Sequence, residues 1–324
     1  MTHRKAVRLL GGGLVLLVLV GCKAVGLGKA KADLQAMWNF KAAHSLVFPL
    51  QAKEREFSAL VTDAESLYLV SERDGRVLRL AYPIGPESEF EEFDLWQREG
   101  AEYEAAALQG DRLYLIDEHA DRSRNVFPLL VTVSLQNPAQ RLAVSPLRWE
   151  GLDCDHGQCL EGLAFVGTRV YLLDERDHLP SGRCASRLYV TTLSALEAGG
   201  RAPPITIDLT LPDCDWRYTA LHPVTIGPRA YLLALRTRCS WNEATQACEK
   251  DEYILELLNP AGAPVVTSSY RFPETTIRWW RMANVSRNLE GIVVGPDGAL
   301  YLASDNRWVL DREPKSLLLR IPPR

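Results

Sequence analysis

The chain has 324 residues, of which 47% are hydrophobic and 24% charged, a composition typical of a folded globular protein and not of a disordered or fibrous one. Its formal net charge of −4 gives no electrostatic reason to expect nucleic acid as a partner. The length suits one large domain or two modest ones, and we expect a monomer.

The N-terminus reads as a bacterial lipoprotein signal. A basic stretch that contains Arg4, Lys5 and Arg8 precedes an apolar run from 9 to 20, which is shorter than the ~20 residues that span a bilayer. The run ends in Leu-Val-Gly-Cys at 19–22, which resembles a lipobox whose Cys22 becomes lipidated. We therefore predict a signal peptide at 1–21, and the Lys23 that follows favours the outer membrane over the inner one.

Residues 22–43 have no strong period and are predicted to form a lipid-anchored tether, with a short helical turn around 34–40. From His44 to the end, short runs rich in Val, Leu and Tyr alternate with Gly, Pro, Asp and Asn, as in strands and turns. No segment has the pattern of a long amphipathic helix. The predicted class of the 44–324 domain is therefore all-β.

One strand pattern occurs five times. An apolar run is followed about ten residues later by a strand centred on tyrosine, at Tyr68, Tyr114, Tyr171, Tyr231 and Tyr301. This spacing is typical of propeller blades. A third strand follows each tyrosine strand, and a fourth follows in the first four repeats only.

The fifth repeat lacks a fourth strand because the sequence ends at Arg324. An open propeller would leave an unpaired strand edge. The spare strand 44–50 is therefore predicted to complete the last blade and close a five-bladed β-propeller. A six-bladed ring, with one irregular blade, is the alternative.

Six cysteines remain in the exported domain, an even number that favours disulfides. Cys154 and Cys159 bracket a short loop and Cys239 and Cys248 bracket another, which leaves Cys184 to pair with Cys214. A zinc site is the alternative, but no close Cys-x-x-Cys or histidine pair supports it.

The repeat aligns two columns of residues on one face of the disc, because the first two strands of a blade are antiparallel. The start column, where each first strand begins, contains Ser58, Glu104, Glu161, Thr219 and Glu290. The end column, where each second strand ends, contains Glu72, Glu118, Glu175, Leu235 and Asp305, and the next residues include Arg73, Arg176, Arg236 and Asn306. If the first strand is innermost, both columns surround a central funnel.

The third and fifth repeats carry the most specific motifs, Leu-Glu-Gly-Leu at 160–163 and Asn-Leu-Glu-Gly-Ile at 288–292. With Ser-Asp-Asn at 304–306, they resemble the phytase-like "esterase-like activity of phytase" propellers and, more distantly, gluconolactonase and paraoxonase propellers. In the lactonase-like relatives, glutamate and Asn/Asp residues near the axis bind calcium or another divalent ion. The resemblance thus implies a metal set of Glu161, Glu290, Asp305 and Asn306, although Ser58, Thr219 and Leu235 depart from the pattern.

Two functions fit these features. Clustered oxygen donors suit a hard cation such as Ca²⁺, so the funnel is predicted to bind a ligand with such an ion. The alternative is a metal-dependent hydrolase of phosphate esters or related esters. A third possibility is purely structural, with the acids paired to Arg73, Arg176 and Arg236 across neighbouring blades. The predicted funnel residues are Glu104, Glu118, Glu161, Glu175, Arg176, Arg236, Glu290, Asp305 and Asn306.

Overall fold

The computed structural model describes residues 33–42, 44–48, 57–85, 87–119, 126–149, 152, 154, 159–178, 183–201, 203–242, 247–260, 265–274, 276, 288–305 and 316–324. At 44–48, 177–178, 240–242, 247–251, 265, 305 and 316 the description covers the backbone. The predicted signal peptide, Cys22 and Asn306 lie outside these residues. The described part belongs to one compact unit, Ala32–Arg324.

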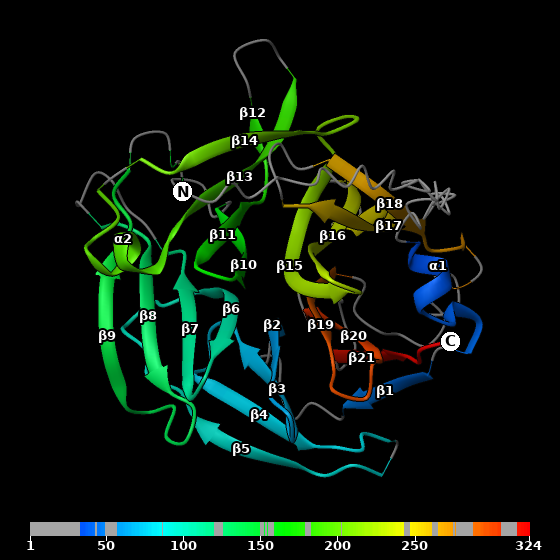
Figure 1. Cartoon of the computed structure of the whole chain (residues 1–324), viewed down its shortest axis with the longest axis horizontal. Coiled ribbons are helices and arrows are strands. Elements are labelled where there is room, and N and C mark those ends of the chain that lie inside the picture. Colours follow the sequence, from blue (N-terminus) through cyan, green and yellow to red (C-terminus); the bar gives the residue numbers. More distant parts are fainter. Residues whose placement is uncertain are drawn as a thin grey trace, which may run out of the picture. The chain divides into compact units, whose positions relative to one another are not determined.

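Five antiparallel sheets form the five blades of a β-propeller, which confirms the predicted class and blade number (Figure 1). Blade one contains β2 (Phe57–Thr62), β3 (Ser66–Ser71), β4 (Arg76–Ala81) and β5 (Phe90–Asp94). Blade two contains β6 (Tyr103–Gln109), β7 (Arg112–Asp117), β8 (Leu129–Ser134) and β9 (Arg141–Pro146). Blade three contains β10 (Leu160–Val166), β11 (Arg169–Asp174), β13 (Cys184–Thr192) and β14 (Ile205–Thr210), with the short β12 (Asp177–His178) beside β13.

Blade four contains longer strands: β15 (Trp216–Ile226), β16 (Arg229–Asn242), β17 (Ala247–Asn259) and β18 (Val265–Arg271). Blade five joins the two ends of the propeller. Its strands are β19 (Asn288–Val294), β20 (Leu300–Asp305), β21 (Ser316–Ile321) and β1 (His44–Phe48). β1 pairs antiparallel with β21, from His44 opposite Arg320 to Phe48 opposite Ser316. The closure predicted from the missing fourth strand is confirmed.

The first strand of each blade is innermost, and these strands contact one another in the cyclic order β2, β6, β10, β15, β19 and back to β2. The hydrophobic core lies between blades: five apolar clusters of the described residues each combine side chains from two neighbouring blades. The repeated tyrosines are buried in these clusters. Their periodicity in the sequence therefore reports the packing of sheet on sheet.

The compact unit begins earlier than the predicted boundary at His44. The helices α1 (Leu34–Met37) and η1 (Phe40–Ala42) confirm the expected helical turn, but this segment packs on the propeller instead of hanging free. Leu34 and Trp38 are buried, and the Trp38 indole donates a hydrogen bond to the carbonyl oxygen of Gly298 at 3.0 Å. Burying a large aromatic side chain and satisfying its N–H explains why the segment docks.

Helices are otherwise rare. α2 (Leu193–Glu197) links β13 to β14 in blade three. Among the described residues, no helix is long and apolar enough to cross a membrane.

Candidate functional site: a carboxylate ring on the propeller axis

A β-bulge interrupts every inner strand at the same place. The register against the second strand shifts once in each blade, and the extra residue is a member of the predicted start column: Ser58, Glu104, Glu161, Thr219 or Glu290. A bulge bends the strand and redirects one side chain. The five bulges therefore fix five equivalent side chains around one axis.

Two of these five positions hold neighbouring blades together. The Ser58 hydroxyl donates to the carbonyl oxygen of Tyr103, and the Thr219 hydroxyl donates to that of Leu289 at 2.7 Å. Both acceptors precede the bulge of the next blade. The departures of blades one and four from the glutamate pattern are thus hydrogen-bonding positions between blades.

The glycines after Glu161 and Glu290 allow close approach of the next inner strand. A Cβ atom on Gly162 would lie 2.6 Å from the Leu221 Cβ, and one on Gly291 would lie 2.7 Å from the Leu60 Cγ. The other three blades carry alanine at this position: Ala59, Ala105 and Ala220. The Glu-Gly motif therefore combines a site carboxylate with a packing requirement.

Six glutamates are buried on this face of the disc: Glu72, Glu104, Glu118, Glu161, Glu175 and Glu290. Backbone hydrogen bonds hold two of the end-column residues against the next blade. The Tyr103 N–H donates to the Glu72 carbonyl at 2.9 Å, and the Tyr218 N–H donates to the Glu175 carbonyl at 3.2 Å. The ring therefore rests on inter-blade contacts and not on exposed loops.

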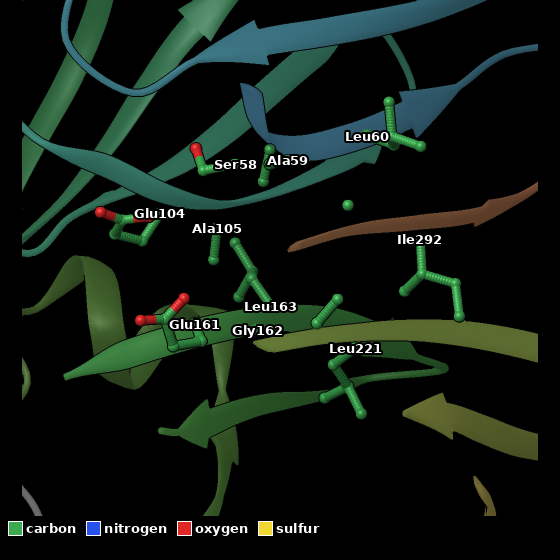
Figure 2. Close-up of a pocket in the computed structure, with 13 residues that line it drawn as sticks. Ser58, Ala59, Leu60, Glu104, Ala105, Glu161, Gly162, Leu163, Leu221 and Ile292 are labelled. Atoms are coloured by element: carbon green, nitrogen blue, oxygen red, sulfur yellow. The ribbon is translucent and has the colours of Figure 1, made fainter. Parts of the chain in front are cut away.

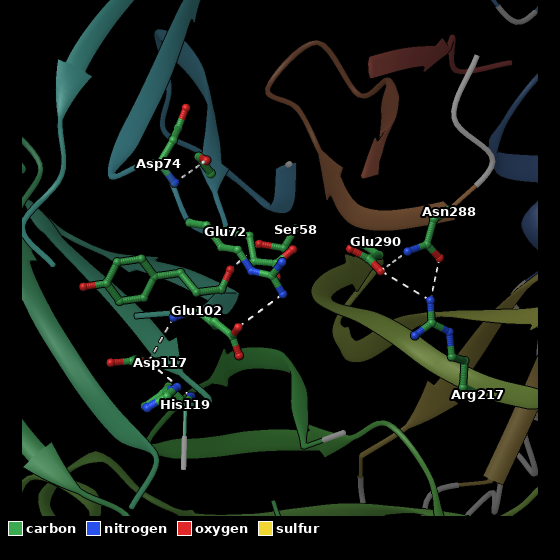
Figure 3. A network of polar contacts seen from close by, with 12 residues as sticks. Ser58, Glu72, Asp74, Glu102, Asp117, His119, Arg217, Asn288 and Glu290 are labelled. Atoms are coloured by element: carbon green, nitrogen blue, oxygen red, sulfur yellow. Dashed lines mark hydrogen bonds and ion pairs between the residues drawn. The ribbon is translucent and has the colours of Figure 1, made fainter. Parts of the chain in front are cut away.

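Carboxylates from three different blades converge. One oxygen each of Glu72, Glu104 and Glu290 lies within 4.8 Å of the others, and Figure 3 shows Glu72 and Glu290 projecting toward the axis from opposite sides. All three side chains are buried. Such a group of oxygens can hold a metal ion.

Burial and mutual repulsion raise the pKa of two glutamates of the ring, Glu104 and Glu161. Burial raises the pKa of Glu104 well above its usual range, and the negative charges of Glu72, Glu161, Glu118 and Glu290 raise it further. Burial likewise raises the pKa of Glu161, together with Glu175, Glu118 and Glu290, while Arg217 acts in the opposite direction. Within the described residues, Oε2 of Glu161 and Oε2 of Glu175 are buried and accept no hydrogen bond.

Arg217 is a cation that enters the ring, and the sequence prediction missed it. Its Nη1 donates to Glu175 of blade three, and its Nη2 donates to Asn288 Oδ1 at 2.5 Å and lies 3.4 Å from Glu290 Oε1 of blade five (Figure 3). Burial disfavours its charge, but Glu175, Glu290 and Glu161 outweigh that effect and raise the pKa of Arg217. The guanidinium therefore stays charged and balances one side of the ring.

The sequence does indicate that Arg217 belongs to the site, because polar residues occur two positions before the bulge in other blades as well. At that position blade two has Glu102, blade four has Arg217 and blade five has Asn288. These residues do make contacts at the funnel, since Glu102 Oε1 lies 3.2 Å from Arg73 Nη2. A third column, polar in every blade except blade three, where it holds Cys159, was thus readable in the alignment of the repeats.

The arginines singled out from the sequence have other partners. Arg73 pairs with Glu72 of its own blade at 2.7 Å as well as with Glu102. Arg176 donates to the carbonyl oxygen of Cys214. Arg236 lies 2.9 Å from Glu256 on β17 and stacks over Trp216, so its ion pair is within blade four and does not cross between blades.

A small cavity lies on the axis between the inner strands (Figure 2). Glu104, Glu161, Ser58 and apolar side chains such as Leu163 line it. Its volume of about 10 Å³ is close to the minimum that holds one water molecule. Within the described residues, this cavity suits an ion or a water.

Two predicted ligands lie outside the described residues, namely the Asp305 side chain and Asn306. Leu235 of the end column is buried and apolar. The disulfides Cys154–Cys159 and Cys184–Cys214 are present as predicted. Cys239 is also disulfide-bonded, and the side chain of Cys248, its predicted partner, lies outside the described residues.

No protein-family model matches the chain, and no curated protein matches its sequence. Solved structures share the propeller fold. Myxococcus xanthus glutaminyl cyclase is 15% identical with a TM-score of 0.50, and the match covers 87% of this chain and 97% of that one. The xyloglucan-locus GH43B protein of Bacteroides ovatus is 12% identical with a TM-score of 0.53, and the match covers 86% of this chain and 54% of that one. At these identities the likeness concerns the fold alone.

Proposed function

We propose that this propeller is an envelope protein that binds a hard divalent cation, Ca²⁺ in the first place, in the carboxylate ring on its axis. The convergence of Glu72, Glu104 and Glu290 within 4.8 Å carries the proposal. The three glutamates come from blades one, two and five. Glu104 and Glu290 occupy the bulges of inner strands, and Glu72 directly follows β3.

Electrostatics favours a cation over an empty ring. Several buried carboxylates this close cannot all ionise without a counter-charge, so they either take up protons or bind a cation. Arg217 supplies one positive charge on the side of Glu175 and Glu290, and Arg73 supplies one beside Glu72. Glu104 and Glu161 line the axial cavity, and within the described residues neither accepts a hydrogen bond from an arginine. The cavity has room for one ion.

The donor set indicates the kind of ion. All the site atoms are carboxylate oxygens, which suit Ca²⁺ or Mg²⁺, and no sulfur or imidazole ligand is among the described residues that gather there. Ca²⁺ takes six to eight oxygens in flexible geometry, whereas Mg²⁺ demands a small octahedron. Glu72, Glu104 and Glu290 would hold the ion, and Glu161 lies close enough to interact electrostatically with Glu104 and Glu290.

The envelope location rests on the N-terminal sequence. A basic stretch, a short apolar run and the box ending at Cys22 support lipidation and export, and the two disulfides suit an oxidising compartment. A chain in which Cys22 carries diacylglycerol would show that mass in the mature protein. A Cys22→Ala variant, which cannot be lipidated, is expected to appear in the soluble fraction.

A metal-dependent hydrolase of phosphate esters or related esters is the second candidate. The raised pKa of Glu104 and Glu161 favours it, because a carboxyl group whose pKa is raised keeps its proton over a wider pH range and can act as a general acid. A bound cation would polarise a phosphoryl or carbonyl oxygen. The resemblance of the Glu-Gly motifs to phytase-like propellers points to the same substrate class.

Calorimetric titration with CaCl₂ after chelation tests the binding function. The wild type should bind Ca²⁺ and Glu104→Gln should lose most of the affinity, while Glu197→Gln, an exposed glutamate on α2, should match the wild type. A panel of phosphate esters, carboxylate esters, lactones and N-terminal glutaminyl peptides then separates the candidates. Ca²⁺ binding without turnover supports the binding protein, and turnover that Glu104→Gln abolishes supports the enzyme.

A further inference from the structure

The face of the disc opposite the carboxylate ring carries a repeated arginine. In blades two, three and four, the inner strand turns into the second strand through a two-residue turn that begins with glycine at positive φ: Gly110, Gly167 and Gly227. The residue after each turn is arginine, namely Arg112, Arg169 and Arg229. All three arginines are exposed, and within the described residues none forms an ion pair.

More cations and exposed apolar side chains lie on the same face. Fourth strands begin at the end of the blade where inner strands end, on the outer edge of each sheet, so Arg141 and Leu142 of β9, Ile205 of β14 and Val266 of β18 lie at this end too. Arg141 stacks over Trp96 at 4.8 Å. The apolar side chains are 46%, 67% and 45% exposed, respectively. Arg201, exposed in the link before β14, completes a group that we call the turn-face patch: Arg112, Arg141, Arg169, Arg201, Arg229, Leu142, Ile205 and Val266.

The patch is positive on a protein of negative net charge. The patch contains five arginines. In blades two to four, the described turns, links and strand starts at this end of the disc contain two acidic residues, Asp111 and Glu197. The whole chain has a net charge of −4, and the opposite face concentrates six buried glutamates at the axis. On the same face, the turns and links of blades one and five carry the acidic residues Asp63, Glu65, Glu87, Glu89 and Asp297. The positive charge is therefore confined to the part of the face that blades two to four form.

We propose that the turn-face patch rests on the anionic lipid headgroups of the bilayer to which the chain is anchored, so that the carboxylate ring opens away from the membrane. Arginines next to exposed aliphatic side chains are the combination that binds an anionic bilayer surface. This inference rests on the proposed lipidation of Cys22 but not on metal binding.

The length of the tether permits this orientation. Eleven residue steps separate Cys22 from Asp33, and an extended chain covers at most ~3.6 Å per residue, or roughly 40 Å. The inner strand β10 has 7 residues, a height of roughly 24 Å at ~3.4 Å per residue. Since the tether is longer than the disc is thick, it allows either face to meet the membrane, and the exposed arginines of blades two to four favour the face that carries the turn-face patch.

Hydrogen exchange of the full lipidated chain on vesicles tests the orientation. On vesicles of phosphatidylethanolamine and phosphatidylglycerol, we expect slower exchange around 109–112, 166–169 and 226–229 than in detergent. The protection should be lost in the triple variant Arg112→Gln, Arg169→Gln, Arg229→Gln and kept in the triple Arg→Lys variant. Arg183→Gln, at an exposed arginine before β13, should leave it unchanged.

Protection of the bulge face around 57–60 and 103–106, or equal exchange of the wild type and the Gln triple variant, would overturn the proposal. The mass of the mature chain reports separately whether Cys22 is lipidated. If it is not, the patch still predicts salt-sensitive co-sedimentation with the phosphatidylglycerol vesicles. The triple Gln variant should then bind roughly 100-fold more weakly, from about a factor of five per arginine. Equal binding of both proteins, or binding to RNA in preference to vesicles, would refute a lipid partner.

Discussion

A Cβ atom added to Gly291 of blade five would lie 2.7 Å from the Leu60 Cγ of blade one, closer than real Cβ contacts come. The contact crosses the seam at which the chain closes its ring, since β19 and β2 are the last and first inner strands. The seam is therefore held both by the pairing of β1 with β21 and by close packing at the axis.

Gly291→Ala should therefore destabilise the propeller by about 1–3 kcal/mol, the usual cost of overpacking. Chemical denaturation of both proteins measures it. Leu60→Ala in the same chain should relieve the clash, so the double variant should lose less than the two single losses added together. Gly85→Ala is the control, because nothing lies within 4 Å of the new Cβ there. Strict additivity of the double variant would argue against the contact.

Serine should be able to replace Thr219, whereas valine should not. Thr219→Val keeps the shape and removes the hydroxyl that donates to the buried Leu289 carbonyl at 2.7 Å. The unsatisfied acceptor should cost about 1–3 kcal/mol, whereas Thr219→Ser should retain most of the stability. Melting temperatures of the three proteins provide the comparison. If valine is tolerated as well as serine, the hydroxyl does not pin blade four to blade five.

Arg217 should be the residue whose loss the ring tolerates least. Arg217→Met leaves Glu175 and Glu290 buried without their shared cation, and breaking a buried pair in this way costs about 3–5 kcal/mol. Adding Glu175→Gln to this variant should recover part of the loss because it removes one uncompensated charge. No recovery in the double variant, measured by denaturant unfolding at pH 7, would contradict the pairing.

The metal-free protein should become less stable as pH rises. Glu104 and Glu161 have a pKa raised from an ordinary value of 4.5, so the folded chain binds more protons than the unfolded chain between that value and the raised one. Stability is then highest below about pH 4.5 with respect to these groups and falls with increasing pH across the window. Melting in EDTA from about pH 5 to pH 8 measures the slope.

Glu161→Gln should flatten that slope, because the amide has no proton to lose. Ca²⁺ should reverse the trend in the wild type, since binding needs deprotonated carboxylates and strengthens as pH rises. A wild-type slope that is flat or rises with pH would mean that the two carboxyl groups ionise freely in the folded chain.

The blades were predictable because packing imposes a period on the sequence. Tyr68, Tyr171 and Tyr301 recur on second strands that pack between sheets, and the start and end columns follow from antiparallel pairing. The closing strand followed from counting strands. Such features depend on local pattern and register alone, which a single sequence contains.

The partners of the charges were not predictable in the same way. Arg236 directly follows the end column, yet its guanidinium pairs with Glu256 inside blade four, whereas Arg217 reaches two other blades. A long side chain can turn either way at a given position of the repeat, so that position does not determine its direction. Trp38 likewise lay in a stretch without period, and its docking depends on a carbonyl 260 residues away.

Native mass spectrometry of the purified chain tests the carboxylate ring most directly. After dialysis against EDTA and addition of CaCl₂, we expect one Ca²⁺ per chain in the wild type and in Glu197→Gln. Glu104→Gln should bind at least about tenfold more weakly while keeping its fold, as judged by its melting temperature. A wild type that takes up neither Ca²⁺ nor Mg²⁺, or a Glu104→Gln variant that binds as tightly as the wild type, would contradict a cation site on the propeller axis.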